Sequence, residues 1–246
     1  MYSGSYQIPA ITLTGSIARD IILIDKVIGA GEIAISDHRS SHPTIKDMLE
    51  LSSQTHIGGL LGGKAGVVHL HVGDGKDGLG LLMQILKESD LPIEQFVPTH
   101  INRNPVLFEQ AIEYCRRGGN IDFTAGETVG IPVPQAIRMM LDKGLNLSKV
   151  TISSDANGSI PDGGISRMQS LYNDVIECIS QSVLKPEDAF RIVTENVARI
   201  LKIYPKKGTL QVGSDADILI TDKNYKIQMV FGMGKLLVEN GTVLGS

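Results

Sequence analysis

The chain is poor in the residues that mark several classes of protein. It contains no tryptophan and only two cysteines, and aromatic residues make up 4% of its 246 residues. Cys115 in IEYCRRGG and Cys178 in VIECISQ both lie in helix-like patterns, and neither has a partner at C-x-x-C spacing. We therefore expect two reduced thiols that serve packing, and no disulfide framework.

The sequence also lacks long apolar runs and an excess of positive charge. No hydrophobic stretch approaches the ~20 residues that a membrane-spanning helix needs, and the N-terminal MYSGSYQIPA lacks the basic and apolar regions of a secretory signal. The formal net charge is −4, and no basic stripe offers an electrostatic footprint for nucleic acid. These absences predict a cytoplasmic protein that binds neither membranes nor nucleic acid.

What the sequence does contain is a regular alternation of strand-like and helix-like segments. With 42% hydrophobic residues the chain can bury a large core. Five strand-like segments, each followed by a helix-like stretch, span residues 31–40, 66–74, 94–104, 119–127 and 148–159. This order predicts an α/β fold with a parallel sheet, in which polar residues at the strand ends suit a (β/α)8 barrel.

An open doubly wound sheet is the competing fold. No G-x-G-x-x-G opens a helix in this chain, which counts against dinucleotide binding. From about residue 204 the pattern changes to short strands separated by glycine turns, and ENGT is a hairpin signal. We expect residues 1–203 to form the barrel-like domain and residues 204–246 to form part of a small β-rich layer.

Four side chains capable of metal chemistry stand near the ends of different predicted strands. They are Glu32, His71, His100 and Asp155. Each has an ordinary structural explanation when taken alone, such as a hydrogen-bonded core histidine or a helix-capping carboxylate. Convergence on one barrel mouth would instead give the imidazole and carboxylate ligands of a hydrolytic zinc site. In the HLH segment, His69 and His71 share one strand face, so the residues alone allow two ligands, one or none.

Several longer motifs carry a resemblance to a known family. They are GSYQIP, AISDHRS, GGLLGGKAGV, H-x-GD, PTHINRN, SSDANGS and KGTLQVGSDADILI. Together they resemble the isoaspartyl dipeptidases of the amidohydrolase superfamily, and the resemblance runs along the whole chain. It implies a (β/α)8 TIM barrel of the amidohydrolase type and hydrolysis of isoaspartyl (β-aspartyl) dipeptides at a site with two zinc ions.

The resemblance also implies roles for the candidate metal ligands. His71 and His100 match the histidines that bind the more exposed zinc, and His69 becomes a packing residue or a support for the ligands. Asp155 matches the aspartate that binds the other zinc and acts as general base. Glu32 stands where the best-known members have a carboxylated lysine that bridges the metals, and we expect its carboxylate to bridge them directly.

Further matches concern the substrate. Tyr6 matches the tyrosine that polarises the scissile carbonyl, and Arg39, Arg103 and Ser159 match groups that hold the carboxylates of the dipeptide. The arginine assignments have independent physical support, because a planar guanidinium binds a carboxylate through two parallel hydrogen bonds.

The order of the histidines implies an incomplete barrel. Members of the superfamily begin with an H-x-H on the first strand, but only His100 follows His71, so HLH belongs to a later strand. We expect the C-terminal portion of such an enzyme, with its N-terminal strands missing. Expected partners are a dipeptide substrate and either further copies of the chain or a complementing N-terminal segment. The alternatives are a catalytically incomplete fragment or assembly subunit, and another amidohydrolase such as a dihydroorotase-like cyclic amidase.

Overall fold

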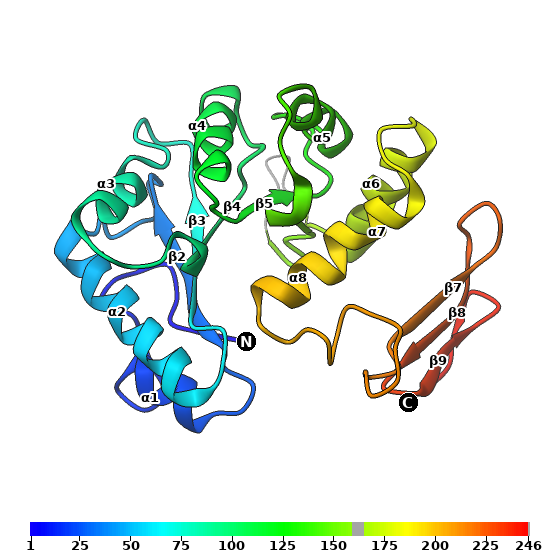
Figure 1. Cartoon of the computed structure of the whole chain (residues 1–246), viewed down its shortest axis with the longest axis horizontal. Helices are drawn as coiled ribbons and strands as arrows, with labels where there is room; N and C mark the ends of the chain where they lie inside the picture. Colours follow the sequence, from blue (N-terminus) through cyan, green and yellow to red (C-terminus); the bar gives the residue numbers. More distant parts are fainter. Residues whose placement is uncertain (159–164, 246) are drawn as a thin grey trace.

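The computed structural model describes residues 1–158 and 165–245, and parallel strands form the centre of its larger part (Figure 1). The strands are β1 (Tyr2–Ser3), β2 (Gly29–Ile35), β3 (Val67–Val72), β4 (Phe96–Thr99), β5 (Ile121–Thr124) and β6 (Val150–Ser153). One sheet has the order β1-β2-β3-β4, and β5 pairs with β6. All of these pairings are parallel, as the alternation in the sequence predicts.

Helices lie outside these strands (Figure 1). They are α1 (Ile17–Leu23), α2 (Ile45–Gly62), α3 (Gly80–Glu88), α4 (Pro105–Arg116), α5 (Val133–Asp142), α6 (Met168–Ser180), α7 (Pro186–Val193) and α8 (Glu195–Ile200). Each strand from β2 to β6 is followed by a helix, which confirms the predicted strand–helix order. Short 3-10 turns at Ile93–Gln95 and Leu147–Lys149 lead into β4 and β6.

Local sequence explains where the helices begin and end. Thr44 caps α2 and exchanges hydrogen bonds with Asp47 in a capping box, and Gly63 ends the helix at φ +61°. Asn104 accepts a hydrogen bond from the Leu107 N–H at the start of α4, where Pro105 occupies the first helical position. These signals fix the lengths of the helices and therefore the spacing of the strands between them.

The two groups of parallel strands meet between β4 and β5. The Ile101 N–H, just after β4, donates to the Asp122 carbonyl of β5 at 3.3 Å, and the Thr99 hydroxyl donates to the Asp122 carboxylate at 2.6 Å. Within residues 1–158 and 165–245 these strands form an open α/β arrangement and not a closed barrel of eight. Apolar side chains fill the core, and Ile33, Phe96 and Phe123 are completely buried in it.

A separate antiparallel sheet ends the chain, to one side of α6–α8 in Figure 1. Its strands are β7 (Ile218–Thr221), β8 (Ile227–Gly232), β9 (Lys235–Glu239) and β10 (Thr242–Val243), in the order β10-β9-β8-β7. Asn240 and Gly241 join β9 to β10 with φ angles of +50° and +73°, the positive values that a tight hairpin turn requires. The predicted β-rich tail and its hairpin are confirmed.

The cysteines and the hydrophobicity of the helices agree with the predictions from the sequence. Cys115 and Cys178 are both free and buried, in agreement with packing roles. Among the helices that the structure describes, none is both long enough and apolar enough to cross a bilayer.

Candidate metal centre

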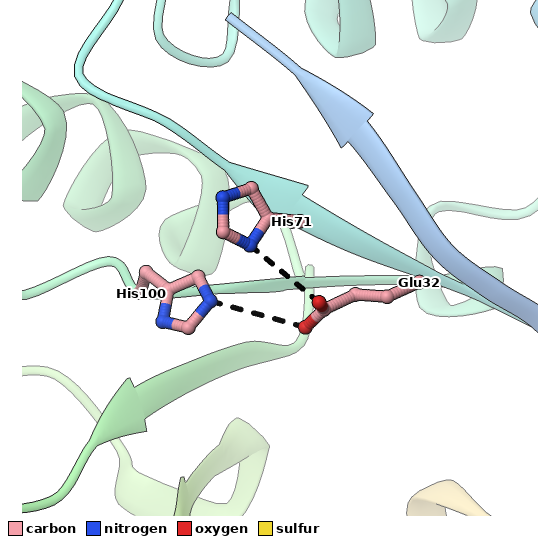
Figure 2. A group of neighbouring side chains, drawn as sticks. All are labelled: Glu32, His71 and His100. Atoms are coloured by element: carbon pink, nitrogen blue, oxygen red, sulfur yellow. Dashed lines mark ion pairs between the residues drawn. The ribbon is translucent and has the colours of Figure 1, made fainter. Parts of the chain in front are cut away.

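Three of the four predicted ligands lie together where β2, β3 and β4 come side by side. Glu32 lies on β2, His71 lies near the end of β3, and His100 directly follows β4. Each offers one ligand atom, and these atoms all lie within 4.8 Å of one another. Figure 2 shows both imidazoles turned toward the Glu32 carboxylate. Their convergence follows from the strand register, which pairs Ala34 of β2 with His71 of β3 and His71 with Thr99 of β4.

His100 presents one ring nitrogen that has no partner. Its Nδ1 lies 2.6 Å from the Thr124 hydroxyl, whereas its buried Nε2 makes no hydrogen bond within the described chain and lies 3.8 Å from Glu32 Oε1. Burial, followed by the charge of Arg103, lowers the pKa of His100 to about 3. The ring is therefore neutral at physiological pH, and its Nε2 faces the carboxylate.

His71 is buried and is contacted on both ring nitrogens. Its Nδ1 lies 3.0 Å from the Tyr6 hydroxyl and 3.5 Å from Glu32 Oε2. Its Nε2 lies 3.0 Å from Asp37 Oδ2 and 2.8 Å from an Arg39 Nη2 nitrogen. The nitrogen that faces Glu32 is thus the one placed to bind a cation.

Glu32 supplies the negative charge of the group. Burial raises the pKa of this carboxyl, but the hydrogen bond with His71 and the imidazoles of His69 and His100 outweigh it and bring the pKa to about 2. An ionised carboxylate and two imidazole nitrogens, one of which makes no hydrogen bond within the described chain, are a donor set that suits zinc. The residues present therefore fit the metal that the sequence predicts.

Asp155 lies near this group but is not one of the three clustered ligands. It lines a cavity of about 710 Å³ together with His100 and Arg103. Burial, and then the charge of Glu32, raise the pKa of Asp155 above its ordinary value. A carboxylate with a raised pKa beside a cavity of ligand size is suited to accepting and returning a proton.

The predicted substrate-binding residues differ in their surroundings. Burial, followed by the charge of Glu32, raises the pKa of Tyr6 to about 12, so its phenol keeps its proton. The Arg39 guanidinium lies 5.2 Å from the centre of the Tyr6 ring and forms a two-pronged ion pair with Asp37. Arg103 donates to the Val72 carbonyl at 3.0 Å and lines the cavity. Ser159 lies outside the described residues.

Two neighbours of the candidate ligands are not singled out by sequence reasoning. Asp37 and Thr124 contact the outer nitrogens of His71 and His100, and each stands at or just after the end of a strand. The signal available for Asp37 is its place in AISDHRS, two residues before Arg39. His69 stacks on Tyr2 with ring centroids 5.2 Å apart, and its Nε2 lies 3.7 Å from Glu32 Oε1.

Comparisons with known proteins place the chain in a family. The model of the amidohydrolase family matches residues 26–245. The crystal structure of a β-aspartyl dipeptidase from Fervidobacterium islandicum AW-1, in complex with the β-Asp-Leu dipeptide, superposes with a TM-score of 0.93 at 41% identity. The match covers 100% of this chain and 67% of that chain, so this chain spans about two thirds of the dipeptidase.

Two curated relatives match shorter segments. A dihydropyrimidinase from Arabidopsis thaliana is 35% identical over 87 residues, which cover 34% of this chain and 16% of the relative. An L-hydantoinase from Paenarthrobacter aurescens is 48% identical over 44 residues, which cover 18% and 10% of the two chains. Because the family match extends through most of the sequence and the fold agrees with it, the chain belongs to the amidohydrolase family of hydrolases.

Proposed function

We propose that this chain carries the metal site of an enzyme that hydrolyses β-aspartyl dipeptides. The observation that carries the proposal is the Glu32, His71 and His100 group in a fold that superposes on a β-aspartyl dipeptidase with a TM-score of 0.93. We further propose a (β/α)8 TIM barrel as the architecture of the complete enzyme. Residues 1–203 would belong to that barrel and residues 204–246 to a small β domain.

The chain's own residues have distinct roles in this proposal. Glu32, His71, His100 and Asp155 would hold two zinc ions, with the Glu32 carboxylate as the bridge. Zinc, when bound, lowers the pKa of a coordinated water to near neutrality. Asp155, whose pKa is raised by burial, accepts a proton from the attacking water and returns it to the leaving amine. The protonated Tyr6 phenol donates a hydrogen bond to the scissile carbonyl.

Substrate choice would come from the cationic groups around the cavity. β-Aspartyl and α-aspartyl dipeptides with the same neutral second residue both have two free carboxylates. They differ in which aspartyl carboxylate is free, and therefore in where it lies. Arg39, Arg103 and Ser159 would bind these carboxylates in the β-linked arrangement. A charged group left unpaired in a desolvated site costs about 1–3 kcal/mol, which corresponds to roughly tenfold discrimination or more.

The specificity test compares matched β-Asp-Leu and α-Asp-Leu dipeptides. We expect Arg103→Met to lower kcat/KM for the β-linked dipeptide about tenfold or more, and to lower it much less for the α-linked one. Zinc content should be unchanged, since Arg103 lines the cavity without being a ligand. An equal fall for both linkages would mean that Arg103 does not read the linkage.

The metal site is tested by Glu32→Gln. An amide is neutral and bridges cations poorly, so this variant should lose zinc as well as activity. Metal analysis of the purified proteins measures the loss, and Glu50→Gln at an exposed position of α2 serves as the matched control. Activity of the unmodified enzyme should not depend on added bicarbonate, because a glutamate bridge requires no carbon dioxide. Full zinc content in Glu32→Gln would contradict the bridging role.

A cyclic-amide hydrolase is the second candidate. The segments shared with a dihydropyrimidinase and an L-hydantoinase favour it, although they cover 34% and 18% of this chain. Parallel assays with β-Asp-Leu and with a hydantoin separate the two activities. If the chain hydrolyses neither while binding zinc, it acts as an incomplete fragment or an assembly subunit.

A further inference from the structure

Asp37 follows β2 and lies between a proposed metal ligand and a proposed substrate-binding arginine. Its side chain is only 3% exposed. Oδ2 lies 3.0 Å from His71 Nε2 and 2.9 Å from Arg39 Nη2, and Oδ1 accepts from the Arg39 Nε at 3.0 Å. The Arg39 backbone N–H also donates to Oδ1, at 2.7 Å. One buried carboxylate therefore contacts both functional side chains.

The position of the proton on His71 decides whether this residue can be a ligand. Nδ1 lies 3.5 Å from Glu32 Oε2, and to bind a metal beside that carboxylate it must present a lone pair, which requires the proton to lie on Nε2. Asp37 can accept a hydrogen bond from that proton, whereas Arg39 has only donors. In the opposite tautomer, Nε2 would accept from Arg39 at 2.8 Å and Nδ1 would present a hydrogen to Glu32. Asp37 is thus the group that favours the binding tautomer.

Gly73 lies so close to Asp37 that there is no space for a side chain at position 73. A Cβ added to Gly73, the residue after β3, would lie 2.4 Å from Asp37 Cβ and 2.5 Å from Asp37 Oδ2. The Gly73 N–H donates to the Ile35 carbonyl at 3.1 Å, which holds the two strand ends against each other. A side chain at Gly73 would therefore clash with Asp37, and Asp37 would have to shift.

His100 provides an internal contrast. Its outer nitrogen contacts the Thr124 hydroxyl, a neutral group that can donate or accept and so leaves the tautomer open. The outer nitrogen of His71 instead contacts a carboxylate that is also bound by a guanidinium. A carboxylate on the outer nitrogen orients a ligand histidine and makes it a stronger base.

We propose that Asp37 is a positioning residue, which fixes His71 in its metal-binding tautomer and holds the Arg39 guanidinium over Tyr6. This inference rests on the proposed function, since it takes His71 as a ligand. Through its contacts with His71 and Arg39, the Asp37 carboxylate connects the proposed metal site with the proposed substrate-binding residues. Arg39 keeps guanidinium hydrogens that Asp37 does not use, and these remain available for a substrate carboxylate.

The test measures the zinc affinity of the full chain by competition with a chromophoric chelator. Asp37→Asn and Gly73→Ala should each weaken zinc binding by about 10–100-fold, although neither removes a ligand. The control for Asp37→Asn is Asp20→Asn, which also removes the charge of a buried carboxylate that accepts several hydrogen bonds. The control for Gly73→Ala is Gly62→Ala, because a Cβ at Gly62 would meet no atom closer than 3.4 Å. Both controls should bind zinc like the unmodified chain. In nitrogen-15 spectra of the zinc-loaded chain, the His71 proton should lie on Nε2.

The outcomes separate this inference from the proposed function. If the unmodified chain binds zinc and Asp37→Asn and Gly73→Ala bind it equally well, Asp37 has no positioning role and the proposed metal site stands. A His71 proton on Nδ1 in the zinc-loaded chain would also overturn the proposed role of Asp37, while the proposed metal site would stand. Failure of the unmodified chain to bind zinc would overturn both. Equal weakening in Asp20→Asn would trace the effect to lost stability and overturn the specific role.

Discussion

The parallel strands and the C-terminal antiparallel sheet of this protein are built on different principles. Every residue of β4 is buried, whereas no residue of β8 or β9 is. The parallel strands are covered by helices and read as nearly continuous apolar runs, while β9 alternates between exposed and half-buried positions. All three clustered ligands come from the buried sheet. Rigid, enclosed strand ends can therefore hold a charged site in place, and the exposed sheet has no comparable environment.

The largest expected effect contrasts an aromatic residue on a parallel strand with one in the C-terminal sheet. Phe123 on β5 is completely buried, with its ring centre 6.0 Å from that of Phe108, whereas Phe231 on β8 is only half-buried. We expect Phe123→Ala to lower the free energy of unfolding by about 3–5 kcal/mol and Phe231→Ala to lower it clearly less. Denaturant unfolding measures both. Equal losses would mean that the C-terminal sheet is as tightly packed as the parallel one.

Zinc removal should affect the two sheets unequally. At a free zinc concentration of 100 times Kd, binding to the folded state stabilises it by about 2.7 kcal/mol. Hydrogen exchange with and without a chelator should therefore show faster exchange in β3 and β4, which carry His71 and lead to His100. Exchange in β8 and β9 should change little. A uniform change along the chain would indicate that both sheets unfold as one unit.

The smallest effect concerns two aspartates that accept hydrogen bonds. Asp20 is buried and accepts from the Ser3 and Thr14 hydroxyls at 2.6 Å and from the backbone N–H groups of Leu13 and Thr14. Burial raises the pKa of Asp20, but these hydrogen bonds outweigh it and hold the pKa below its ordinary value. Asp20→Asn should cost about 1–3 kcal/mol of stability at neutral pH.

The matched comparison is Asp217 near the C-terminal sheet, which is 41% exposed and accepts from the Met233 N–H at 2.7 Å. Asp217→Asn should cost less than Asp20→Asn, because water can replace its lost hydrogen bonds. A depressed carboxyl pKa stabilises the fold above the unfolded pKa of about 3.9, and this contribution is lost as the pH falls. The stability gap between the unmodified chain and Asp20→Asn should therefore narrow below about pH 4. If this difference in stability stays constant at acid pH, packing and not the charge of Asp20 causes it.

Much of the fold can be predicted because its determinants are local. The strand–helix order follows from apolar segments and capping signals such as Thr44 with Asp47, and the final hairpin follows from Asn240 and Gly241. The closed barrel is different. The sequence predicts an incomplete barrel, and the described strands form one group of four and one of two; closure depends on how many strands pair and at what tilt, which no local pattern specifies.

By itself, the sequence determined which side chains stand at the strand ends. His71 and His100 are placed there by strand length, and a parallel sheet then brings strand ends to one edge. The tertiary structure alone decided which atoms of these side chains meet. His100 Nε2 makes no hydrogen bond to residues 1–158 or 165–245, Asp37 contacts His71 Nε2, and Gly73 leaves Asp37 room; all three depend on contacts between residues distant in the chain. Such contacts follow from the packing of neighbouring strands at ångström precision, and residue spacing carries no information at that scale.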